Sequence, residues 1–272
     1  MFLEENVVYR YKYLPFNENS IKTIVEGSIS FTCPLAFNDP FDCRPYVCPN
    51  SALDISAKRP DLYRKVGQEL GLSPAKRIMS KSVILKRLKD RVESGKWITD
   101  LLVGVGVVSL STDALNTLMW SHYADFHRGF VLEFRIPLRG REEEAKFARD
   151  RLTPFPVRYS ENRPHVEMFS NPHDLVEKIL LTKSLDWAYE AEERVVDQIR
   201  GPGIFKYRRD DILRSIICGV KMPLDDFNRL QAVVAALAES FMPNLRIFRA
   251  EEYPRKYGIH VPGHPRLGNL AP

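Results

Sequence analysis

The sequence predicts an α+β fold: a single domain, 1–272, with a mixed, mainly antiparallel split sheet and a helical insertion. Three observations favour this class over a doubly wound parallel sheet. Segments of strand and helix periodicity alternate irregularly, the strand segments are short, and no strand leads into a GxGxxG turn. The 272 residues suffice for one large core, and 44% hydrophobic with 28% charged residues is typical of globular proteins.

The first elements follow from local chemistry. Val7 to Tyr13 is rich in β-branched and aromatic residues, which favours a strand. Asn19 or Ser20 can cap a short helix that ends at Gly27, where a left-handed cap is wanted. Ser28 to Thr32 then alternates apolar and polar residues, so we expect a half-buried strand there.

The middle of the chain, from about Leu53 to Asp100, is expected to be a helical insertion layered over the core. Its segment Ser73 to Ser94 has apolar residues at helical spacing, Ser73 as N-cap, and seven Lys or Arg residues. Two interpretations of this basic helix stay open. Its charges form either a solvated face or a surface that attracts a polyanion such as nucleic acid.

The second half supplies the other strands and helices. A buried strand is expected at Val107 to Ser111, and residues 111–113 offer an N-cap for a short helix through His122. Strict alternation over Phe130 to Ile136 predicts an antiparallel strand with one wet face. The remaining expectations are strands at 157–160, 194–199, 215–220 and 245–248, helices at 174–183 and from Asp225, and an extended or mobile tail at 254–272.

Composition excludes several classes of protein. No run of about 18 apolar residues exists, and the N-terminus lacks the layout of a secretory signal, so a cytoplasmic location without a membrane partner is expected. The four cysteines form no C-x-x-C pair, which argues against structural zinc and for reduced, mostly buried thiols. A net charge of +5 permits a nucleic-acid partner without requiring one.

The first candidate motif is the loop Phe37-Asn38-Asp39-Pro40-Phe41-Asp42. Asn, Asp and Pro are turn formers, so the carboxylates could simply satisfy the turn. Two flanking aromatic residues would instead pin the loop to the body and hold Asn38, Asp39 and Asp42 in place. Such a loop can bind a cation, a ribose hydroxyl or a base.

The second motif is Trp120-Ser121-His122-Tyr123-Ala124-Asp125. On a helix, Trp120 and Tyr123 share one face, and His122 and Asp125 share another, so an imidazole–carboxylate pair can form. Histidine is the usual general acid or base near neutral pH. The competing interpretation is a hydrogen-bonded core histidine.

The third motif follows Lys183 and runs through Trp187-Ala188-Tyr189-Glu190-Ala191-Glu192-Glu193-Arg194. If strand geometry begins near Glu190, then Glu190, Glu192 and Arg194 line one face, and the arginine moderates repulsion between the carboxylates. Such a pair could be catalytic. A plain Glu–Arg salt bridge is the alternative.

Several familiar motifs are absent, namely GxxxxGK[ST], GxGxxG after a strand, GxSxG and HExxH. Their absence argues against P-loop NTPases, Rossmann dehydrogenases, α/β-hydrolases and zincin proteases. No spacing of residues requires a metal site. One assembled from Asp39, Asp42, His122 and Glu190 would suit a metal-dependent phosphodiesterase or nuclease.

The order of the motifs resembles the bacterial family called domain of unknown function 2971. The resemblance rests on YKY, FNDPFDC, SLS, MWSHYAD-x-H-x-GF and K-x-x-x-W-x-YE-x-E-x-R, and it runs from Tyr11 to about Val220. One departure is Glu193, where relatives tend to have Trp, and it blurs which glutamate is functional. The resemblance implies a cytoplasmic bacterial protein, with some relatives tied to defence against phage.

The layout also resembles, more distantly, the ADP-ribosyltransferases, whose small split sheet grips NAD. The resemblance implies that a basic residue of the first strand and a hydroxyl of the second bind NAD, and that a late-strand glutamate acts on the nicotinamide ribose. The matching positions are Arg10, Tyr11, Lys12, Ser30, Thr32, and Glu190 or Glu192.

The expected function is therefore an NAD-using ADP-ribosyltransferase or NAD glycohydrolase. Tyr11, Trp120 or Tyr123 would sandwich the nicotinamide, while a glutamate steadies the positive charge that develops as nicotinamide leaves. The acceptor is protein, nucleic acid or water. Two alternatives remain: the metal-dependent phosphodiesterase or nuclease, and a module that senses a nucleotide or binds a partner without turnover.

Overall fold

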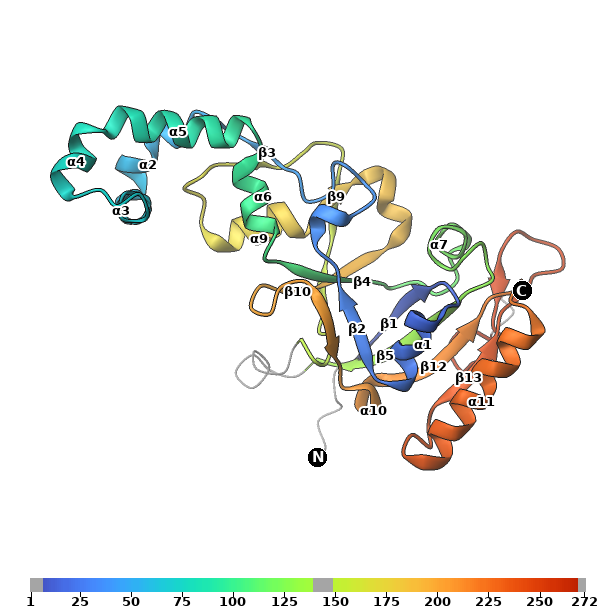
Figure 1. Cartoon of the computed structure of the whole chain (residues 1–272). Helices are drawn as coiled ribbons and strands as arrows, with labels where there is room; N and C mark the ends of the chain where they lie inside the picture. The colour runs from blue at the N-terminus through green and yellow to red at the C-terminus, as the bar shows by residue number, and fades with distance from the viewer. Residues whose placement is uncertain (1–6, 139–148, 269–272) are drawn as a thin grey trace, which may run out of the picture.

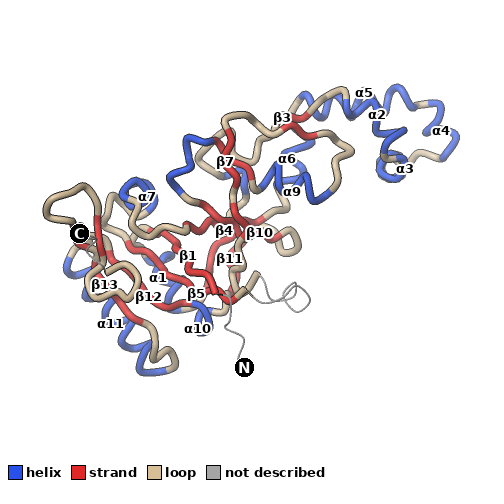
Figure 2. The backbone as a smooth tube through the Cα atoms, turned by 180° about the vertical axis from the view of Figure 1, so that it is seen from behind, coloured by secondary structure: helices blue, strands red, loops and turns tan. Residues whose placement is uncertain are grey.

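A seven-stranded sheet forms the body of the protein in the computed structural model, which describes residues 7–138 and 149–268 (Figure 1). Neighbouring strands are antiparallel except β12 and β13, so the expected mixed, mainly antiparallel α+β fold is confirmed. Figure 2 shows the same strands seen from behind the view of Figure 1. In spatial order they are β13 (Arg246–Arg249), β12 (Leu213–Cys218), β5 (Phe130–Pro137), β1 (Val7–Leu14), β4 (Gly106–Ser111), β10 (Glu192–Asp197) and β6 (Phe155–Pro156).

Four two-stranded ribbons surround this sheet. A bridge between Thr32 and Val107 ties the first of them to β4, which brings the end of β2 beside the sheet. The ribbons are β2 (Ser28–Phe31) with β11 (Gly203–Lys206), β3 (Tyr46–Val47) with β8 (His165–Val166), β7 (Arg158–Ser160) with β9 (Thr182–Ser184), and β14 (Glu251–Glu252) with β15 (Ile259–His260).

The helices of the body start at caps other than those expected. Asn17, rather than Asn19 or Ser20, caps α1 (Glu18–Val25) through its side chain, and Asn116, rather than residues 111–113, caps α7 (Thr117–Tyr123). Asp225 lies in a first turn instead of capping it. These elements are α1 (Glu18–Val25), η1 (Pro34–Ala36), η2 (Leu185–Glu190), α7 (Thr117–Tyr123), α9 (Pro172–Leu180), α10 (Arg209–Ile212) and α11 (Leu224–Ser240).

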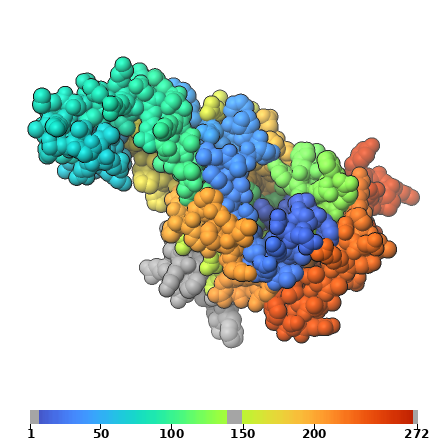
Figure 3. Space-filling view, viewed as in Figure 1, coloured from blue at the N-terminus to red at the C-terminus, as the bar shows by residue number. Residues whose placement is uncertain are grey.

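The helical insertion is present, but it projects from the sheet body instead of layering over it (Figures 1 and 3). It has its own small core, which includes Ile55, Leu85 and Met168. Ser73 caps a helix as expected, yet the basic helix breaks at Ser80. The insertion consists of α2 (Ser51–Lys58), α3 (Pro60–Glu69), α4 (Pro74–Met79), α5 (Lys81–Glu93) and α6 (Lys96–Leu102).

Both faces of the sheet are covered, which corrects the expectation that β5 has a wet face. Leu132 and Phe134 are fully buried in one cluster, and Val131 is fully buried in another. The second cluster includes Val261 of the tail. Within the described residues, the tail expected to be extended or mobile therefore packs onto the sheet.

The cysteines match expectation, since all four are free and Cys43 and Cys218 are buried. Burial raises the pKa of the Cys218 thiol to about 12, which keeps it protonated and unreactive. Within the described ranges, no helix has both the length and the apolar character needed to cross a membrane.

Candidate functional site

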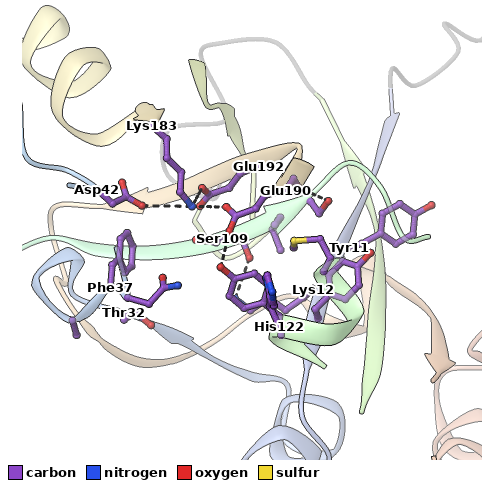
Figure 4. Close-up of a pocket in the computed structure, with 17 residues that line it drawn as sticks. Tyr11, Lys12, Thr32, Phe37, Asp42, Ser109, His122, Lys183, Glu190 and Glu192 are labelled. Carbon is purple, nitrogen blue, oxygen red and sulfur yellow. Dashed lines mark hydrogen bonds and ion pairs between the residues drawn. The ribbon is translucent and has the colours of Figure 1, made fainter. Parts of the chain in front are cut away.

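A pocket of about 420 Å³ opens where two strands of the sheet separate. Strands β1 and β4 pair only through Tyr11 and Ser111, and the pocket wall takes Lys12, Tyr13 and Ser109 from beyond that point. Nine of the twelve candidate residues line this space: Tyr11, Lys12, Thr32, Asn38, Asp42, His122, Tyr123, Glu190 and Glu192 (Figure 4). The three motifs therefore meet at one pocket.

A network of buried charges forms one wall of the pocket. The Lys183 ammonium donates to Glu190, lies 3.1 Å from Glu192 Oε2 and 3.6 Å from Asp42 Oδ2. Arg194 is fully buried behind it and binds Glu192 Oε1 at 2.9 Å and Asp42 Oδ2 at 2.6 Å. Three carboxylates are thus matched by two cations, so each buried charge has a partner.

The two glutamates have different electrostatic environments. Burial alone would raise the pKa of Glu192, but the charge and hydrogen bonds of Arg194, with Lys183, lower it to about 2. Burial raises the pKa of Glu190 above its ordinary range, although Lys183 and Tyr123 act in the opposite direction. The pKa of Glu192 therefore favours its anionic form, whereas the pKa of Glu190 is shifted in the opposite direction by burial.

An unusual backbone conformation brings both glutamates to the same pocket. Glu190 ends the 3₁₀ helix η2, Ala191 has the left-handed φ of 45°, and Glu192 begins β10. The Ser111 hydroxyl donates to the Glu190 carbonyl at 2.7 Å and holds this turn against β4. The expectation that Glu190 belongs to the strand is wrong, but Glu192 and Arg194 do share a strand face.

Aromatic side chains make up much of the remaining wall. The Tyr123 hydroxyl donates to Glu190 Oε1 at 2.6 Å, and burial followed by this bond raises the pKa of Tyr123. Tyr11, Tyr13 and Phe37 also line the pocket. Such a combination of ring faces and a few directed polar groups is typical of sites for small molecules.

Lys12 adds a cation near these rings. Its ammonium donates to the Ser109 carbonyl at 3.0 Å, and within the described ranges it forms no ion pair. Burial lowers the pKa of Lys12, against the effect of Glu192. An anionic ligand group would therefore find a desolvated ammonium without a paired carboxylate.

His122 lines the pocket but does not pair with Asp125. Its Nδ1 lies 3.0 Å from the Tyr189 hydroxyl, and its ring is exposed. Asp125 has a positive φ of 46°, lies beyond the end of α7 and binds Arg128 instead. The proposed imidazole–carboxylate pair fails because the helix ends at Tyr123, so the expected three-residue spacing no longer applies.

Three other candidates lie outside the pocket. Arg10 forms an ion pair with Glu193, on the sheet face opposite to Glu192. Trp120 is fully buried, and its indole N–H donates to the Ala114 carbonyl at 2.8 Å, so it is a core residue. Asp39 accepts the Phe41 backbone N–H at 2.9 Å, as a turn carboxylate does.

The aromatic residues of the loop behave differently from each other. Phe37 is partly buried against a hydrophobic cluster, and its ring faces Arg194, whose guanidinium carbon is 5.3 Å from the ring centroid. Phe41 is 62% exposed, so only one of the two expected anchors holds the loop. Asp42 is fixed mainly by Arg194 and Lys183.

Sequence reasoning missed the importance of Lys183 and of the serines of β4. Lys183 comes from β9, which is outside the main sheet, so strand alternation gives no indication of its direction. Ser109 and Ser111 belong to the predicted buried strand and to the SLS motif, and Ser111 also to the predicted N-cap, but neither was expected to line the site. Their alternation with Leu110 was the available signal, because both face the same side as Glu192.

The donor set does not favour a metal ion. Within the described part of the chain, no group of three or more His, Cys, Asp or Glu residues could hold one. The carboxylates of Asp42, Glu190 and Glu192 converge, but the Lys183 ammonium occupies the position that a cation would take. This arrangement gives no support to the metal-dependent alternative.

Comparison with known proteins gives one match, to a family model. Searches of curated proteins and of solved structures find no match, so they lend no support to an ADP-ribosyltransferase-like fold. A family model described as "Protein of unknown function (DUF2971)" matches residues 119–195. This span contains the second and third motifs and the two glutamates of the pocket, in line with the expected resemblance.

Proposed function

We propose that the pocket binds a nucleotide of the NAD class and that Glu190 promotes the release of nicotinamide from it. The observation that carries the proposal is a buried carboxyl group, bound at one oxygen by a tyrosine hydroxyl, in a pocket of about 420 Å³ that also contains tyrosine rings. The proposal rests on this chemistry and not on a resemblance of fold.

Glu190 is the better candidate of the two glutamates. Both oxygens of Glu192 are held by Arg194, at 2.9 and 3.0 Å, and fix the shape of the site. Glu190 Oε1 has a neutral partner, the Tyr123 hydroxyl, which a ribose hydroxyl could replace. Glu190 is therefore assigned the reacting position, and Glu192 the position that orients Lys183.

The reaction follows from these positions. The glutamate accepts a hydrogen bond from the 2′-hydroxyl and stabilises the positive charge that develops on the nicotinamide ribose. The bond between C1′ and the ring nitrogen breaks, and nicotinamide leaves with the electron pair. Water or a nucleophile on an acceptor then bonds to C1′ and loses its proton. Lys12 is suited to the pyrophosphate.

The test is nicotinamide release from NAD by the purified protein, with and without cell extract. We expect Glu190→Gln to lower the rate by about 100-fold while NAD binding persists, because the amide cannot stabilise the developing cation. Glu193→Gln is the matched control, since Glu193 is bound to Arg10 outside the pocket. No release in any condition, together with no shift in melting temperature on adding NAD, would remove the proposal.

A ligand-sensing module is the second candidate, and one observation favours it. Glu190 is already neutralised by Lys183, which would oppose positive charge in a substrate. Under this alternative, NAD or a related nucleotide raises the melting temperature, no nicotinamide appears, and Glu190→Gln weakens binding alone. The same two measurements therefore separate the candidates.

A further inference from the structure

Another hollow, of about 500 Å³, is lined by Pro40 and Phe41 of the same loop that contributes Asn38 and Asp42 to the pocket. It is found where β3 meets the end of α5, at the junction of the sheet body and the helical insertion (Figure 1). We define the arginine–aromatic hollow by four of its lining residues: Phe41, Arg44, Tyr46 and Arg163.

The rings of this hollow are exposed although they are large and apolar. Phe41 is 62% exposed and Tyr46 is 54% exposed. Each has one neighbour that sets its orientation: Arg163 lies over the Phe41 ring, and His165 stacks on Tyr46 with centroids 5.5 Å apart. Each ring has one face next to a neighbour and keeps more than half of its area exposed, so the pair offers surface on which flat groups can stack.

The charge of the region is positive. Within the described ranges, neither Arg44 nor Arg163 forms an ion pair with a carboxylate; Arg163 donates to the carbonyls of Arg44 and Pro45. The hollow continues into α5 through Val92 and Glu93. The segment 73–94, which contains α5, has seven Lys or Arg residues against two Asp or Glu residues. A polyanion is therefore attracted along this side of the molecule.

We infer that the arginine–aromatic hollow and α5 bind single-stranded nucleic acid. Bases stack on Phe41 and Tyr46, and the cations of the hollow and of α5 follow the phosphates. A duplex would hide its base faces from both rings. On this inference the basic segment is a polyanion surface and not only a solvated face. It is separate from the pocket chemistry, but the same loop borders both.

The test is a titration of a fluorescein-labelled single-stranded oligonucleotide, followed by fluorescence anisotropy at two salt concentrations. We expect binding that weakens as salt rises, and a loss of about tenfold in affinity for Phe41→Ala and for Tyr46→Ala. Tyr257→Ala, which removes an exposed ring that does not line the hollow, is the control that should bind like the wild type. Tyr46 is an exposed residue of a two-residue strand, so this variant is expected to fold even if Phe41→Ala does not.

Three results would overturn the inference: no binding, salt-insensitive binding, or unchanged affinity in the folded Tyr46→Ala variant. A proline-rich peptide that displaces the oligonucleotide more strongly than an unlabelled strand would reassign the hollow to a protein partner. Nicotinamide release without oligonucleotide tests the pocket independently, so failure of one proposal does not conceal failure of the other.

Discussion

Lys183 is the residue that joins the three motifs of the pocket. Its ammonium is buried among Asp42, Glu190 and Glu192, and these carboxylates raise its pKa even though burial would lower it. Removing one partner of a buried ion pair leaves uncompensated charge, which is far more costly than removing a surface pair. The stability of this region is therefore expected to depend on one side chain.

We expect Lys183→Met to lower the free energy of unfolding by about 3–5 kcal/mol, measured by urea denaturation. Lys206→Met is the matched control, because Lys206 is 69% exposed in its side chain and its change should stay below about 1 kcal/mol. Similar losses of unfolding free energy in the two variants would show that the buried network contributes no more to stability than an exposed lysine does.

The depressed pKa of Glu192, about 2 against an ordinary 4.5, makes stability depend on acidity. A carboxyl whose pKa is lowered by folding contributes stability that is present above pH 4.5 and is lost as the pH falls toward 2. We expect Glu192→Gln to flatten the dependence of unfolding free energy on pH in this range. A variant with the same acid dependence as the wild type would contradict the assigned pKa.

At the level of single residues, the sequence predicted the acidic and aromatic members of the site better than their partners. Glu190 and Glu192 stand out as carboxylates at the start of a predicted strand and Asp42 as one in a loop, and the pocket contains all three. Trp120 looked equally functional, yet its indole N–H is satisfied by a nearby carbonyl inside the core. Residue type alone does not distinguish a ring that lines a pocket from one that fills a core.

The turn between η2 and β10 is the element that positions both glutamates. Ala191 adopts φ 45° and ψ 48°, which costs an L-residue about 1–2 kcal/mol relative to the right-handed region. Glycine adopts this region without the penalty, although it loses more entropy on folding. This turn therefore stores strain next to the carboxyl of Glu190.

We expect Ala191→Gly to raise the melting temperature by a few degrees, and Ala191→Val to lower it, because a β-branched residue tolerates positive φ least. Calorimetry of the two variants and the wild type gives the order directly. A glycine variant less stable than both of the others would show that the turn is unstrained.

The main strands were predictable from the sequence, whereas most helix caps were not. The predicted bounds of β1, β4 and β5 agree with the structure within a residue or two, because β-branched, aromatic and apolar residues favour strands. Helix starts were misplaced, as at Asn17 and Asn116, because several neighbouring Asn, Ser and Asp residues can each cap a helix. The separation of β1 from β4 creates the pocket, and the local sequence pattern of these strands does not indicate it.

At the scale of the whole molecule, the tail packs against the sheet and binds a buried carboxylate on β5. Glu133 is 2% exposed and accepts from Ser215 at 2.7 Å, while Arg266 forms an ion pair with it. His264 accepts two backbone N–H groups at Nδ1, so its Nε2 carries the proton that points toward Glu133. Burial would raise the pKa of Glu133, but these contacts lower it.

We expect Arg266→Leu to destabilise the whole fold by roughly 1–3 kcal/mol, a range reduced because the Arg266 side chain is a third exposed. Arg255→Leu, at an exposed arginine of the same tail, should change stability by less than about 0.5 kcal/mol. Equal stability of the two variants in urea would mean that the tail does not hold the sheet.

Burial of the tail and of both sheet faces could not be read from the sequence. Pro and Gly in the last residues indicate irregular backbone, which is correct, but irregular backbone can still pack. The mixed α+β class was predictable because it depends only on the order and length of periodic segments. How the insertion and tail sit against the sheet depends on contacts between distant segments.

The central claim is that one pocket, built from three distant motifs, holds a nucleotide against Glu190. A crystal structure of the Glu190→Gln variant with NAD tests it most directly. The account predicts that the nicotinamide ribose lies within hydrogen-bond distance of residue 190, beside the rings of Tyr11 and Tyr123. NAD bound elsewhere on the protein, or a pocket left without ligand at saturating NAD, would contradict it.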